Sequence, residues 1–136
     1  MGAEATLGPS GLCHEDFRPE NMRIYRNQVT LFDFDDCGHG PQLLDVATMA
    51  YWLEHGKHKR PGVLWSAFLA GYGIGDSATL RLAVRWLMLQ RQMQSIVWLN
   101  RYCVLTDELW EQVETDTNAI VHRIADGRLK VLRASL

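Results

Sequence analysis

The stretch from residue 13 to residue 36 constrains the fold most, because it contains two polar loops joined by one predicted β-hairpin. Residues 22–25 alternate in character as a strand does, and residues 29–32 form a second apolar run. Arg26, Asn27 and Gln28 can make the turn between them. An antiparallel return of this length brings the loop before the first strand beside the loop after the second. We therefore expect the two polar loops to share one site.

These two loops carry the oxygen-bearing side chains that phosphoryl transfer needs. Asp16 and Asn21 lie in the first loop, which Pro19 stiffens, and Asp33 follows the second strand. One carboxylate can orient an attacking hydroxyl and accept its proton, while an amide oxygen and a second carboxylate hold Mg²⁺, a hard cation that prefers oxygen ligands. Asp16, Asn21 and Asp33 fit these roles. The permanent positive charge of Arg18 is expected near the phosphates.

The same stretch resembles the protein-kinase-like superfamily. Residues 14–21, His-Glu-Asp-Phe-Arg-Pro-Glu-Asn, look like its catalytic loop, and residues 33–35, Asp-Phe-Asp, look like its metal-binding segment. The Gly-containing residues 36–40 and the Asp-Val-Ala that starts at Asp45 look more like the branch with the aminoglycoside phosphotransferases, homoserine kinase and choline kinase. This resemblance implies ATP and Mg²⁺ as cofactors, bound weakly by this chain, and a small-molecule hydroxyl as the acceptor.

The resemblance also implies a role for each matching residue. His14 would support the backbone of the catalytic loop, and Asp45 would brace this loop from the following helix. Asn21 and Asp33 would contact the cofactor and hold the metal. Asp35 could be a further metal ligand, or equally a surface or capping residue. The candidate catalytic residues are Asp16, Arg18 and His14.

The sequence departs from the family pattern in two places. Position 15 is Glu, where the small-molecule kinases usually have Gly. Only thirteen residues precede His14, so no Gly-rich phosphate loop and no strand Lys of an N-lobe comes before it in this sequence. The resemblance thus covers the later part of a kinase C-lobe, and it is strong over about residues 12–52 and faint beyond. We expect the isolated chain to be inactive, with the N-lobe lost or supplied by a separate chain.

Length and composition favour one domain with its own core, since 47% of the 136 residues are hydrophobic. We expect a flexible leader over residues 1–11 and a single kinase-like C-lobe domain over residues 12–136. The predicted fold class is α+β and mostly α, with the hairpin followed by four helices. Asp76 or Ser77 can cap the third helix and Asp107 the fourth. The predicted helices cover about residues 42–54, 63–70, 79–102 and 108–124.

Charge and composition argue against several other classes of protein. A net charge of -2 gives no electrostatic reason to expect nucleic acid. No apolar run reaches the length of a membrane span, and the first residues lack the features of a signal peptide. Three cysteines without framework spacing suit the cytoplasm. A zinc site is an alternative to magnesium, but its spacing lacks the usual C-x2-C knuckle. Its ligands would be Cys13, His14, Cys37 and His39.

Apolar side chains that need a cover predict self-association. The third helix is apolar around more than half of its circumference and is expected to be mostly buried. The hairpin and the loop after it are apolar as well, through Ile24, Val29, Leu31, Phe32 and Phe34. We expect a homodimer to cover such surface. A catalytically inert kinase-like module that self-associates or binds a partner or ligand is therefore the alternative function.

The acceptor itself is not named by the sequence. Five acidic residues could line a site for a cationic substrate, although exposed helix ends are often acidic for other reasons. These residues are Glu54, Asp76, Asp107, Glu108 and Glu111.

Overall fold

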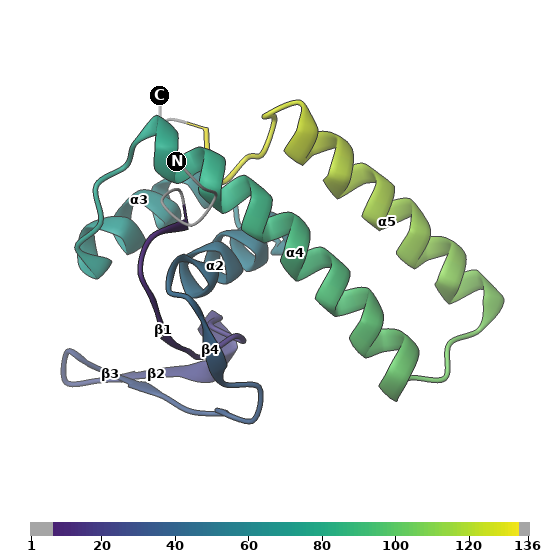
Figure 1. The fold of residues 1–136 in the computed structure, drawn as a ribbon, viewed down its shortest axis with the longest axis horizontal. Helices are drawn as coiled ribbons and strands as arrows, with labels where there is room; N and C mark the ends of the chain where they lie inside the picture. Colours follow the sequence, from purple (N-terminus) through teal and green to yellow (C-terminus); the bar gives the residue numbers. More distant parts are fainter. Residues whose placement is uncertain (1–6, 134–136) are drawn as a thin grey trace.

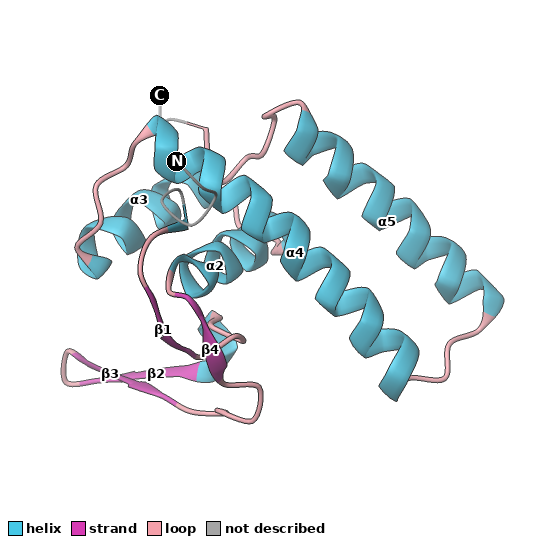
Figure 2. Cartoon of the chain, in the orientation of Figure 1, coloured by secondary structure: helices cyan, strands magenta, loops and turns pink. Residues whose placement is uncertain are grey.

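The computed structural model describes residues 7–133, where two small antiparallel sheets are followed by four long helices (Figure 1 and Figure 2). One sheet pairs β1 (Ser10–Cys13) with β4 (Gly38–Pro41), and the other pairs β2 (Met22–Tyr25) with β3 (Gln28–Leu31). A short 3-10 turn (Pro19–Asn21) precedes β2. The predicted α+β, mostly helical fold is confirmed.

The β2–β3 hairpin is closed by a two-residue turn. Arg26 and Asn27 have φ values of 47° and 61°, the left-handed conformation that a type I′ turn needs at both central positions. Gln28 was predicted to be part of the turn but belongs to β3. A two-residue type I′ turn matches the twist of the two strands better than the predicted three-residue turn does. The backbone N–H of Phe32 donates to the Asn21 carbonyl at 3.2 Å. This bond continues the pairing past the strands and brings the two polar loops to one end of the hairpin.

The β1–β4 sheet was not predicted. Ser10 and Gly11, placed in the leader by the sequence analysis, belong to β1, and the Gly-containing loop after the hairpin forms β4. The strands lie close to the next helix, since a Cβ on Gly11 would be 2.7 Å from the Gln42 amide nitrogen. Residues 1–6 of the expected leader lie outside the described residues. The sheet ties the start of the first polar loop to the end of the second.

The four helices follow in the predicted order as α2 (Leu43–His55), α3 (Pro61–Tyr72), α4 (Ala78–Tyr102) and α5 (Asp107–Ala125). Ser77 caps α4, its hydroxyl accepting from the Leu80 N–H at 3.1 Å. Thr106, and not Asp107, caps α5. Because α5 begins one residue earlier than predicted, Asp107 is its first residue and cannot also be its cap.

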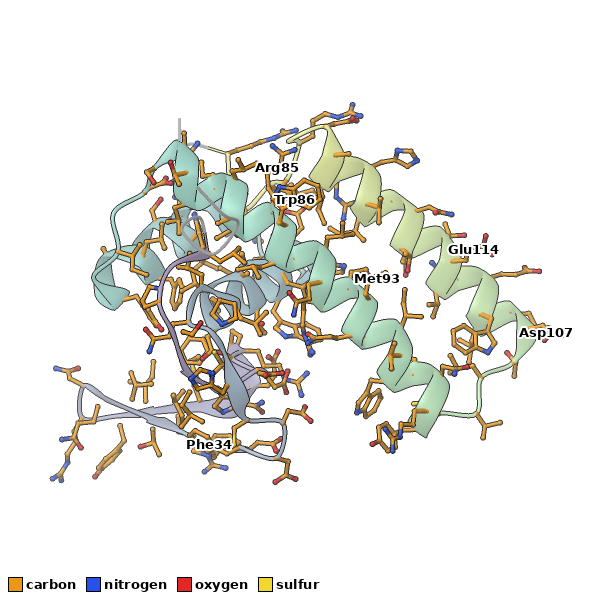
Figure 3. All side chains as sticks on the ribbon, viewed as in Figure 1. Phe34, Arg85, Trp86, Met93, Asp107 and Glu114 are labelled. Carbon is orange, nitrogen blue, oxygen red and sulfur yellow. The ribbon has the colours of Figure 1, made fainter. Side chains whose placement is uncertain are left out.

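The core is built around α2, which is buried over most of its length and packs against α4 (Figure 1). Arg85 fixes α4 to the end of α5 (Figure 3), since its guanidinium donates to the Ile124 carbonyl at 2.9 Å and the Ala125 carbonyl at 2.8 Å. Within residues 7–133, no helix combines the length and the hydropathy of a membrane span.

The expectation that the long helix is mostly buried is wrong for the single chain. Six residues of α4 are buried, and they lie on the sides that face α2 and α5. The opposite side is exposed because no other element of residues 7–133 packs on it, and the second half of α4 extends beyond α2 (Figure 1). Large apolar side chains on this side are Leu82, Trp86, Met93 and Val97, whereas the exposed Trp98 and Tyr102 lie on the same side as Arg91.

Candidate active site

Asp45 anchors the loop that follows β1. It lies in the first turn of α2, is 8% exposed, and accepts the backbone N–H of His14 and of Glu15, each at 2.9 Å. A carboxylate suits the positive end of a helix, and charge-assisted hydrogen bonds are stronger than neutral ones. The structure therefore places Asp45 where the resemblance implied a brace for the catalytic loop.

His14 is buried inside the loop, with both ring nitrogens engaged by the backbone. Its Nδ1 accepts the Asp16 N–H at 3.3 Å, which assigns the ring proton to Nε2. Nε2 then donates to the Phe32 carbonyl at 3.0 Å, and the Phe34 ring lies 4.5 Å away, centroid to centroid. This geometry lets His14 join the two polar loops and leaves no ring nitrogen free to act as a base.

The Asp16 carboxylate is held by an amide and two guanidinium groups. The Asn21 amide donates to Oδ2 at 2.8 Å, and Arg91 donates to Oδ1 at 3.1 Å. The Nε of Arg18 lies 3.0 Å from Oδ2, but it is not oriented to donate and the contact is an ion pair only. Arg91 comes from α4, 75 positions further along the chain. Asp16 is thus oriented from two distant parts of the sequence.

Trp52 supports both of these guanidinium groups. Its ring lies 5.0 Å from the Cζ of Arg18 and 5.8 Å from the Cζ of Arg91, within the range of cation–π contact. Neither Trp52 nor Arg91 was among the predicted site residues. Arg91 could have been found, because it follows the buried Leu87 and Met88 by about one helical turn. A cation on a buried helix face needs a partner.

The hairpin brings the predicted carboxylates to one pocket of about 610 Å³. Asp16, Arg18 and Asp33 line it together with Asp35 and Asp36, while residues from α2 and α4 form its other side. Asp33 and Asp35 are exposed, and Asp33 has a φ of 66°. Asn21 is buried behind Asp16 and is not part of the lining.

The acidic residues considered for a cationic substrate do not line this pocket. Glu54 is buried and pairs with Arg123 at 3.1 Å, and Asp76 pairs with Arg81. Asp107 and Glu111 line a separate groove between α4 and α5. A cationic molecule in the pocket beside Asp16 would therefore not meet the acidic residues considered in the sequence analysis.

The oxygen chemistry of the site suits Mg²⁺, although the protein offers few ligands. Asp33 and Asp35 present exposed carboxylates, and Asn21 uses its amide nitrogen on Asp16, which leaves its amide oxygen for other partners. Within residues 7–133, no three His, Cys, Asp or Glu side chains are close enough to hold a metal. Mg²⁺ commonly binds one or two carboxylates and completes its coordination with phosphates and water.

Glu15 lies between His14 and Asp16 with a φ of 65°, a left-handed conformation that favours glycine. Burial raises the pKa of Glu15, and the neighbouring Asp45 carboxylate raises it further. The folded chain therefore holds this proton more tightly than the unfolded chain, so that ionised Glu15 costs stability at neutral pH. Position 15 thus carries both backbone strain and charge repulsion.

We expect Glu15→Gly to raise the free energy of unfolding by about 1 kcal/mol at neutral pH, because it removes both costs. The gain should shrink as the pH falls towards the ordinary pKa of the carboxyl group. Urea denaturation at two pH values measures it. Glu15→Ala is the matched control, since it removes the charge and keeps the strain. A destabilised Glu15→Gly chain would contradict this account of the loop.

Asp16 is buried in its loop, the Asp45 carboxylate of α2 braces this loop, and further carboxylates lie at the same pocket, which is the arrangement that the resemblance to the phosphotransferases implied. The comparison with protein families agrees with the geometry. The sequence model of the phosphotransferase enzyme family matches residues 3–87, more than half of the 136 residues. The chain belongs to this family, and the predicted resemblance is confirmed. No solved structure matches the chain.

Proposed function

We propose that this chain supplies the catalytic loop of an ATP- and Mg²⁺-dependent phosphotransferase that acts on a small-molecule hydroxyl. The observation that carries the proposal is Asp16, whose carboxylate is oriented by Asn21 and Arg91 and opens onto the pocket that Asp33 also lines. In the reaction the acceptor oxygen bonds to the γ-phosphorus and the bond to the ADP oxygen breaks. Asp16 takes the hydroxyl proton.

The other site residues have supporting roles in this proposal. Asn21 and Asp33, with Asp35 as a further ligand, would hold Mg²⁺, which neutralises charge on the phosphates. Arg18 lies at the pocket and would add positive charge there. His14 and Asp45 would keep the loop in place through their backbone hydrogen bonds. We further propose the cytoplasm as its location, which suits the free thiols Cys13, Cys37 and Cys103.

The proposal is tested by following transfer of labelled phosphate from ATP to a panel of hydroxyl compounds. Transfer should require Mg²⁺. Where a neighbouring gene encodes an ATP-binding lobe, transfer should also require that this lobe is added to the chain. An upstream reading frame with a Gly-rich loop and a Lys would supply that lobe. No transfer to any hydroxyl with both parts present would contradict the proposal and favour the inert binding module.

The isolated chain is expected to bind Mg²⁺–ATP at millimolar concentration or not at all. Within residues 7–133, the groups offered to a nucleotide are those of one pocket wall, and no Gly-rich phosphate loop stands opposite them. Calorimetry with ATP and Mg²⁺ measures this. Micromolar binding would mean that the chain itself builds a phosphate clamp.

We also propose that the chain forms a homodimer. Ile24, Val29, Phe32 and Phe34 are exposed, as are Trp86 and Met93, which are seven residues apart and lie on the same side of α4 (Figure 3). Leaving apolar surface in water costs roughly 25 cal/mol per Å², so a few hundred Å² amounts to several kcal/mol. A two-fold contact between copies would remove this cost. This same surface favours the alternative of a binding module without turnover.

Light scattering at micromolar concentration is expected to give about twice the mass of the chain. Trp86→Glu should give the monomer mass, because it places a charge on the exposed side of α4. Thr115→Glu adds the same charge to the exposed surface of α5 and should leave the dimer intact. A monomeric wild-type chain would contradict the dimer.

A further inference from the structure

The pocket beside Asp16 is divided by charge. All of its carboxylates come from the two polar loops, namely Asp16, Asp33, Asp35 and Asp36. The residues that α2 and α4 contribute include one cation, Arg91, and no acid. The loop side therefore suits a metal and its phosphates. The acceptor, which is the other substrate, would then bind on the helix side.

Two arginines, Arg18 of the first polar loop and Arg91 of α4, pair with the single carboxylate of Asp16. One carboxylate faces two guanidinium groups, so Asp16, Arg18 and Arg91 together have a net charge of one positive unit. Arg91 contacts the Trp52 ring, and its side chain is only 15% exposed, so little of it faces bulk water. One of its nitrogens donates to Asp16, and its buried Nε has no hydrogen-bond partner among the described residues. A guanidinium has five N–H donors, so most of its capacity is unused.

The same side of the pocket has an exposed aromatic wall. Trp98 and Tyr102 both line the pocket, their ring centroids lie 5.7 Å apart, and both rings are exposed. Exposed aromatic rings next to a fixed cation suit a ligand with an apolar or ring-shaped body and an anionic group. On the helix side a cationic acceptor would meet Arg91 and no unpaired carboxylate, because Asp16 is already paired twice and Asp33, Asp35 and Asp36 belong to the loop side.

We infer that the acceptor carries a negatively charged group, a carboxylate or a phosphate, on a ring or apolar body. The anionic group lies at Arg91, and the body lies against Trp98 and Tyr102. The inference rests on the proposed function, because it names the substrate class of the same site. Arg91 then has two tasks, to orient Asp16 and to select the acceptor by charge.

The test uses three probes with one body and different charges. They are para-(hydroxymethyl)benzoate, para-(hydroxymethyl)benzamide and para-(hydroxymethyl)benzylamine, titrated into the isotope-labelled chain and followed by amide NMR. Benzoate is expected to bind about fivefold more tightly than the neutral amide, which is the effect of one unit charge at a partly exposed site, and the cationic amine should bind more weakly than the amide. Binding is measured without ATP, so a failure of phosphoryl transfer and a failure of this inference give separate results.

Variants of α4 test the residue itself. Arg91→Gln should abolish the preference for benzoate, whereas Arg91→Lys keeps the charge and should keep the sign of the preference. Arg81→Gln removes the same charge from the first turns of α4, where Arg81 pairs with Asp76, and should change nothing in the pocket. Thermal melts check that each variant folds, and the Lys variant retains a readout if the Gln variant does not.

Four results would overturn the inference. They are tighter binding of the amine, no binding of any probe at millimolar concentration, and an unchanged preference in Arg91→Gln. The fourth concerns the nucleotide, whose phosphates offer the same anionic chemistry. If Arg91→Gln weakens Mg²⁺–ATP binding as much as it weakens benzoate binding, the guanidinium belongs to the nucleotide subsite. If Arg91→Gln weakens benzoate binding and leaves Mg²⁺–ATP binding unchanged, Arg91 belongs to the acceptor subsite.

Discussion

Replacing Asp45 with alanine is expected to lower the free energy of unfolding by about 3–5 kcal/mol, because two backbone N–H groups lose a charged acceptor. The N–H of His14 is buried and that of Glu15 is partly buried, so water cannot fully replace the carboxylate. For a domain of this size the melting temperature should fall by roughly 10 °C or more. Urea denaturation followed by circular dichroism measures the change.

Two further variants make the Asp45 result specific. Asp36→Ala removes an exposed carboxylate from the same region and should change stability by less than about 0.5 kcal/mol. Asp45→Asn keeps one acceptor oxygen and should fall between the wild type and the alanine variant. If Asp45→Ala were no less stable than Asp36→Ala, the brace would not hold the loop in solution.

The Asp16→Asn variant should lose phosphoryl transfer by about a thousandfold, the usual contribution of a positioned general base. Because Asn keeps the shape of the side chain, kcat should fall far more than the KM of the acceptor changes. The assay is the phosphate transfer described above, with Asp36→Asn as the control for loss of charge at the pocket. Transfer that persists in Asp16→Asn would show that another group takes the proton.

The contacts of Asp16 in the structure also change the expected effect of Asp16→Asn on the free energy of unfolding. From sequence alone, Asp16→Asn would leave the fold intact and could raise stability slightly, because carboxylates would repel one another. The nearest charged groups are instead Arg18 and Arg91, which would be left without their partner. We now expect a loss of about 1–2 kcal/mol, less than for a fully buried pair because the site opens to solvent. The same urea titrations measure it.

Local patterns were enough to predict the elements that carry the site. The turn at Arg26 and Asn27, the alternation around it and the helical spacing of apolar residues are properties of neighbouring residues. The motifs that carry Asp16, Asn21 and Asp33, together with the Gly-containing residues 36–40 and the Asp-Val-Ala that starts at Asp45, were enough to indicate the family. In each case the physical cause acts over a few residues, so the sequence contains it directly.

Contacts between distant residues were decided only by the tertiary structure. Arg91 reaches Asp16, and Arg85 holds the end of α5, because α4 packs at one particular angle and register against α2 and α5. The pairing of β1 with β4 has the same origin, since short Gly-rich strands give little periodic signal. A guanidinium can pair with any nearby oxygen. Its partner is therefore set by how the helices pack and not by its position in the chain.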